Sequence, residues 1–98
     1  MYVVTVTFDV KGAFYDAFLR LVKKNASLSK EETGCRQFDV CTDNANNQVF
    51  LYEKYDSRQA FEHHLVTAHF FSFEQACIGK LDNKKVQCFE EIWPLQEE

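Results

Sequence analysis

The chain has 98 residues, enough for one domain with a single hydrophobic core. It holds 10 Phe and 4 Tyr against 1 Pro and 3 Gly, which argues against a disordered segment or a loop-rich scaffold. The net charge of -4 gives no electrostatic reason to bind nucleic acid or an anionic membrane surface.

The N-terminal sequence lacks the basic start and the long apolar run of a signal peptide. No segment reaches the ~18 apolar residues of a membrane-spanning helix. We therefore expect a cytoplasmic protein without a membrane partner. The 4 cysteines show no CxxC spacing of the kind that binds zinc or performs redox chemistry, so we expect small, largely buried free thiols.

The first half of the chain predicts three strands and a helix. Apolar side chains alternate over residues 2–10, which is typical of a strand. Helical spacing follows over residues 13–28. Residues 35–41 and 49–55 are again strand-like, and the turn-forming TDNANNQ segment between them predicts a hairpin.

The second half predicts helices and a last strand. Asp56 or Ser57 can cap a helix that starts at this point. Thr67 marks a break, after which a further helix is expected over residues 68–81. The LDNKK segment is interpreted as a turn, and residues 86–93 as the last strand.

The predicted order βαββαβ is the split pattern of ferredoxin-like α+β domains, with a four-stranded antiparallel sheet. Helices in this arrangement cover only one face of the sheet. The other face would carry Phe50, Tyr52, Phe89 and Trp93, which is unusually apolar for a solvated surface. We therefore expect a homodimer that packs sheet against sheet in a barrel-like manner.

The candidate site lies in the segment from Tyr52 to Phe70, which holds all 3 histidines. Histidine changes charge near neutral pH, and Glu53 in an apolar strand is a candidate for a raised pKa. His63 and His64 point about 100° apart on a helix. His64 follows the apolar face, so we expect it to point inward and His63 to be solvated.

Motifs for bound cofactors are absent from the sequence. There is no HExxH pair, no glycine-rich phosphate loop, no GxSxG turn and no flavin or nicotinamide fingerprint. The histidines also lack the spacing of a structural zinc site. We therefore expect no cofactor and no metal.

Several short motifs are similar to those of a known family. They are Gly34-Cys35, Phe38-Asp39-Val40, Tyr52-Glu53-Lys54-Tyr55, His64 and Thr67-Ala68-His69-Phe70. Over nearly all of residues 1–98, the chain resembles the antibiotic biosynthesis monooxygenase domain, a family of small dimeric α+β barrels. The resemblance predicts one such domain over the whole chain.

The resemblance also implies a cavity between the sheet and the helices. Carried onto this sequence, Glu53, His64 and His69 would line it and act as catalytic residues, with Phe38 and Tyr55 as its walls. His64 would be the base, Glu53 would orient it or share the proton, and His69 would polarise a carbonyl or hold a phosphate.

The closest branch of the family contains two kinds of members, so alternatives stay open. One kind oxidises quinols or related aromatic compounds with O2 and without a cofactor, and we predict this activity. The other kind isomerises the phosphorylated autoinducer-2 signal, for which Arg36 is the nearest candidate to bind phosphate. A third possibility is a dimeric protein that binds a small molecule without catalysis.

Overall fold

A computed structural model describes residues 1–94 of the chain. The main elements in chain order are β1 (Tyr2–Val10), α1 (Tyr15–Ser29), β2 (Cys35–Asp43), β3 (Gln48–Tyr55), α2 (Arg58–Leu65), α3 (Ala68–Cys77) and β4 (Leu81–Phe89). Short 3-10 turns precede α1 and β3. Within the described range, no helix combines the length and the apolar character needed to cross a bilayer.

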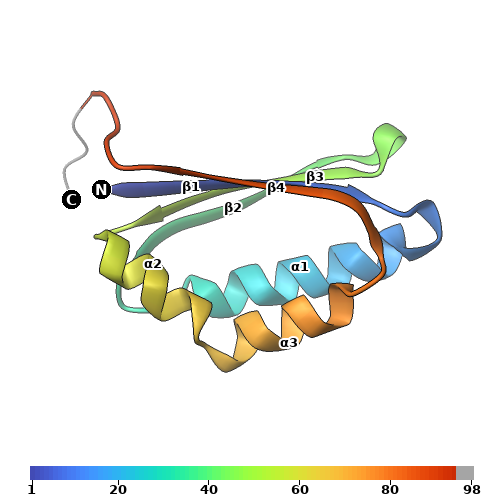
Figure 1. The fold of residues 1–98 in the computed structure, drawn as a ribbon, viewed down its shortest axis with the longest axis horizontal. Helices are drawn as coiled ribbons and strands as arrows, with labels where there is room; N and C mark the ends of the chain where they lie inside the picture. The colour runs from blue at the N-terminus through green and yellow to red at the C-terminus, as the bar shows by residue number, and fades with distance from the viewer. Residues whose placement is uncertain (95–98) are drawn as a thin grey trace.

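The strands form one antiparallel sheet in the order β2-β3-β1-β4. All three helices lie on one side of this sheet, as Figure 1 shows. The predicted ferredoxin-like α+β fold is therefore confirmed. Because β1 and β3 are the central strands, their inward side chains lie under the helices, whereas β2 and β4 form the edges.

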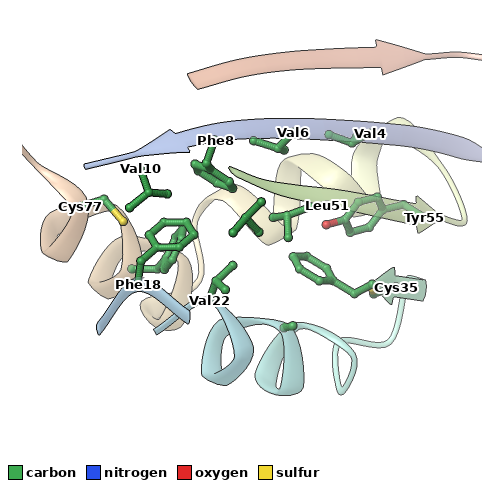
Figure 2. Close-up of a cluster of buried hydrophobic side chains, with 14 of the residues drawn as sticks. Val4, Val6, Phe8, Val10, Phe18, Val22, Cys35, Leu51, Tyr55 and Cys77 are labelled. Carbon is green, nitrogen blue, oxygen red and sulfur yellow. The ribbon is translucent and has the colours of Figure 1, made fainter. Parts of the chain in front are cut away.

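The core lies between the central strands and α1 (Figure 2). Phe8 of β1, Phe18 of α1 and Phe73 of α3 meet with ring centroids 5.0 to 5.9 Å apart, mostly edge to face. Phe18 and Val22 are completely buried, and each such side chain contributes about 1.5–3 kcal/mol of hydrophobic stabilisation. The aromatic trio fixes α3 against both β1 and α1.

Two hydroxyl groups define the boundary between α2 and α3. Ser57 caps α2, since its Oγ accepts a hydrogen bond from the backbone N of Ala60 at 3.2 Å. Thr67 caps α3 by accepting from the N of Phe70 at 3.3 Å, and it donates to the carbonyl O of His64 at 2.8 Å. The predicted break at Thr67 is confirmed, and it turns the chain between the two histidines of the site.

Three boundaries near the C-terminal end differ from the prediction. The helix ends at Cys77 instead of continuing to residue 81, and Gly79 then adopts a positive φ of 76° that turns the chain. The LDNKK segment, which was expected to be a turn, begins β4 instead, where Leu81 pairs with Val10. Almost all side chains of β4 are exposed. Because an exposed strand can be polar on both faces, the first half of β4 shows no apolar alternation from which a strand could be predicted. The strand also ends at Phe89 and not at residue 93.

The cysteines are free thiols. Cys35 and Cys77 are buried, as expected, whereas Cys41 and Cys88 are exposed, so the expectation of burial is wrong for these two. Burial raises the pKa of both Cys35 and Cys77 to about 11, which keeps them in the unreactive thiol form at neutral pH. This agrees with a packing role for the buried pair.

Gly34 allows the loop before β2 to lie directly against α2. A Cβ at Gly34 would lie 2.5 Å from the Cβ of Ala60, closer than two carbon atoms can approach. We expect Gly34→Ala to lower the free energy of unfolding by about 1–3 kcal/mol, as overpacking does, measured by urea denaturation. Gly12→Ala is the control, because its Cβ would meet only the tip of the Asn47 side chain, at 3.3 Å. Equal losses in both variants would contradict the steric argument.

The sheet face opposite the helices exposes large apolar side chains. Phe50 and Phe89, which point away from the helices, are 38% and 43% exposed. We propose that a second copy of the chain covers this face. Sedimentation at micromolar concentration is expected to give twice the chain mass of 11.5 kDa. Phe50→Glu should shift the protein toward the monomer, whereas Lys23→Glu on the exposed side of α1 should not. A wild-type monomer under these conditions would rule the dimer out.

Candidate active site

Glu53 lies at the centre of the sheet, on the inward face of β3. It pairs with Val4 of β1 on one side and Phe38 of β2 on the other. Its side chain points under the helices because it alternates with the outward Tyr52 and Lys54, and the residue is only 3% exposed. The strand pattern therefore places a carboxyl group inside an apolar layer.

Burial dominates the electrostatics of Glu53. Removal from water raises the pKa of its carboxyl group to about 7, and the nearby charge of Glu32 acts in the same direction. The hydroxyl of Tyr55 donates a hydrogen bond to Oε1 of Glu53 at 2.6 Å, which acts in the opposite direction. Glu53 can therefore both accept and release a proton near neutral pH.

The two histidines of the site are joined by a carboxylate that the sequence did not single out. Oε2 of Glu32, in the loop after α1, lies 2.8 Å from Nδ1 of His64 and 2.6 Å from Nε2 of His69. The Glu32 side chain is 8% exposed. Since a carboxylate only accepts hydrogen bonds, both ring nitrogens carry the donated protons.

This arrangement selects one tautomer of His64. With its proton on Nδ1, a neutral ring has its lone pair on Nε2, which is then the atom able to take a proton from a ligand. His64 is 2% exposed, and its ring lies near those of Phe38, Phe61 and Phe70. This burial lowers the pKa of His64, with the Glu32 hydrogen bond acting against the shift, so the neutral base is favoured.

Glu53 and His64 line the same small cavity between the sheet and the helices. Its volume is about 60 Å³, and most of its lining is apolar, including Val4, Leu51 and Phe38. A second, more open hollow of about 380 Å³ lies between α1 and α3 and includes His69. Asn25 and Phe73 line both spaces, so these two side chains separate the inner cavity from the outer groove.

The structure thus places only some of the predicted site residues in the lining of the inner cavity. Glu53, His64 and Phe38 line the inner cavity, whereas Tyr55 lies behind Glu53 as its hydrogen-bond donor. His69 lines the outer groove. It shares Oε2 of Glu32 with His64, and the two imidazole ring centroids lie 6.0 Å apart.

Arg36 and His63 lie away from this cavity. Arg36 forms a two-point ion pair with Asp56, at 2.5 and 3.0 Å, and does not belong to the cavity lining. His63 is exposed, as helical spacing predicts.

Sequence patterns gave little chance of finding Glu32. It belongs to a polar loop segment, SKEETG, in which neither helical nor strand periodicity marks an inward position. The one usable signal was that two histidines near a helix break need a partner when they are buried. That signal indicates a carboxylate without saying which one.

The chain belongs to the antibiotic biosynthesis monooxygenase family, whose model matches residues 1–76. This confirms the family that the motifs suggested. Among curated proteins, none matches the sequence.

Solved structures with the same fold agree with this assignment. A protein from Nitrosomonas europaea, provisionally described as an antibiotic biosynthesis monooxygenase, is 25% identical with a TM-score of 0.88, covering 95% of this chain and 100% of its own. A Mycobacterium tuberculosis protein is 23% identical with a TM-score of 0.85, over 98% and 96% of the two chains. A Deinococcus radiodurans protein is 17% identical with a TM-score of 0.88, over 100% and 99%. The last two are similar in fold alone.

The raised pKa of Glu53 predicts a pH-dependent stability. The unfolded carboxyl group ionises near pH 4.5 and the folded one near pH 7, so the folded state binds more protons between these values. Stability should therefore fall as pH rises from about 4.5 to 7, by about 3 kcal/mol in all.

Urea unfolding at pH 5 and pH 8 measures this effect. Glu53→Gln, which resembles the protonated carboxyl group, should be more stable than the wild type at pH 8 and similar to it at pH 5. A wild type and variant with the same pH dependence would show that the Glu53 carboxyl group is not the cause.

Proposed function

We propose that the protein is a cofactor-independent monooxygenase that oxidises a small quinol-like or phenolic substrate with O2. The observation that carries this proposal is the pairing of two buried proton-transfer groups, Glu53 and His64, around one apolar cavity. A phenol can supply the electrons for O2 reduction itself once a base has removed its proton. The protein then needs a base, a second proton carrier and a dry pocket.

The proposed reaction assigns a proton to each group. Nε2 of His64 takes the phenolic proton, and Glu32 stabilises the resulting imidazolium through Nδ1 at 2.8 Å. The phenolate reduces O2, and a C–O bond forms at a ring carbon. The His64 imidazolium gives the phenolic proton to the outer peroxide oxygen. Glu53 then accepts the proton from the ring carbon as the O–O bond breaks and passes it to the departing hydroxide. The substrate loses two hydrogens and gains one oxygen, and the second oxygen of O2 leaves as water.

The cavity must widen before an aromatic ring can enter. An apolar space of about 150 Å³ accommodates benzene, whereas the inner cavity measures about 60 Å³. Displacement of Phe73 would join it to the 380 Å³ groove, since this side chain lines both. The combined space would reach the range of small-molecule sites.

The charges around the cavity favour an uncharged aromatic substrate over a phosphorylated one. Lys84 is the cation in the lining of the inner cavity, and its Nζ is already 2.6 Å from Oε2 of Glu74. Lys24 lines the outer groove and not the inner cavity. Arg36, the residue considered for phosphate, is paired with Asp56. We therefore place oxidation ahead of isomerisation of a phosphorylated hydroxydione.

Oxygen uptake with a panel of quinols and phenols, using protein freed of metals, tests the proposal. Wild-type protein should consume O2 in proportion to substrate. His64→Ala and Glu53→Gln should each lower the rate by about 10²–10⁴-fold, the usual contribution of a positioned acid or base. His63→Ala is the matched control and should retain the wild-type rate, since its side chain is exposed.

Two other outcomes would overturn this function. Exchange of carbon-bound protons on a phosphorylated hydroxydione, without O2 uptake on any phenol, would favour the isomerase. Tight binding of an aromatic compound with neither reaction would identify a binding protein. Unchanged O2 uptake in His64→Ala would remove His64 from the mechanism.

A further inference from the structure

The structure brings together two imidazoles and a carboxylate from three separate segments. Glu32 comes from the loop after α1, His64 from α2 and His69 from α3, and one donor atom of each lies within 4.8 Å of the others. We propose that these three side chains form a binding site for one divalent transition-metal ion, which takes the place of their mutual hydrogen bonds. The proposal goes beyond the oxidation proposed above, because it assigns a different ligand to the same side chains.

The donor set matches the chemistry of such ions. Two histidine nitrogens and one carboxylate oxygen are a common protein ligand set for Zn²⁺, Fe²⁺ and related ions. With metal–ligand bonds of about 2.0–2.2 Å, neighbouring donors lie roughly 3 Å apart. Oε2 of Glu32 now lies 2.8 Å from Nδ1 of His64 and 2.6 Å from Nε2 of His69. Since all three donor atoms already lie within 4.8 Å of one another, small movements of these side chains would bring them to this spacing around an ion.

A second observation points to a missing ligand. Oε1 of Glu32 is fully buried and has no hydrogen-bond partner among residues 1–94. A buried acceptor left unsatisfied costs about 1–3 kcal/mol, and more when it carries charge. A cation bound by both oxygens of Glu32 would satisfy this atom, which the two histidines leave unpaired.

The site is also reachable from solvent. The His69 side chain is 18% exposed and lines the open groove of about 380 Å³ between α1 and α3. An incoming hydrated ion can therefore approach without opening the core. The open volume of this groove leaves room for water to complete the coordination shell.

Metal binding would alter the proposed base. An ion bound at Nδ1 of His64 leaves the proton of the neutral ring on Nε2, so His64 can no longer take a proton from the substrate. Metal-loaded protein should therefore lose the proposed oxygenase activity. A divalent ion would act as an inhibitor of this site and not as its cofactor.

Titration of metal-free protein with Co²⁺, followed by displacement with Zn²⁺, tests the proposal without any substrate. One Co²⁺ per chain should bind, detected by its visible absorption, and Zn²⁺ should abolish that signal. His69→Ala and Glu32→Gln should each weaken Co²⁺ binding by at least ~10-fold. His63→Ala is the matched control, because it removes a neighbouring but exposed imidazole, and its affinity should equal that of the wild type.

The outcomes separate this proposal from the proposed function. Equal Co²⁺ affinity in wild type and His69→Ala would overturn the metal site, as would loss of binding in His63→Ala. His69→Ala keeps the test valid if Glu32→Gln fails to fold, which circular dichroism detects. Because Co²⁺ binding is measured without substrate, its result does not depend on whether the protein consumes O2. Where O2 uptake is observed, full activity in Zn²⁺-saturated protein would overturn the inhibitory role.

Discussion

One carboxylate oxygen, Oε2 of Glu32, ties the loop behind α1 to both α2 and α3. The two helices meet at Thr67, whose hydroxyl caps one and bonds to the end of the other. Together these polar contacts hold His64 against the apolar cavity, where packing alone would not fix which ring nitrogen carries the proton. The chemistry proposed for Glu53 and His64 therefore depends on a residue that lies outside their cavity.

The two buried carboxyl groups of the site differ because their surroundings differ. Glu53 lies among apolar side chains and receives one hydrogen bond from Tyr55, and burial brings its pKa to about 7. Glu32 instead meets two imidazoles. A carboxyl group that exchanges protons and a carboxylate that orients a base are the complementary roles seen in many acid–base sites.

Local periodicity explains which features the sequence could predict. The alternation of β1, the break at Thr67 and the inward direction of His64 each follow from spacing within a few residues, and the structure has all three. The start of β4 could not be predicted, because an exposed edge strand needs no apolar alternation. Glu32 is separated in the sequence from His64 by 32 positions and from His69 by 37 positions. No short-range pattern encodes contacts between residues so far apart.

Phe73 has a role in the aromatic core that bears on how tightly any ligand can bind. It packs edge to face on Phe8 and close to Phe18, yet it also separates the inner cavity from the groove. If the displacement of Phe73 costs ~3 kcal/mol, under about 1% of molecules have the cavity open at any moment. The apparent affinity for a ligand is then reduced more than ~100-fold. Core packing and ligand affinity are then in opposition at this side chain. A smaller residue here would yield a less stable protein that binds its ligand more tightly.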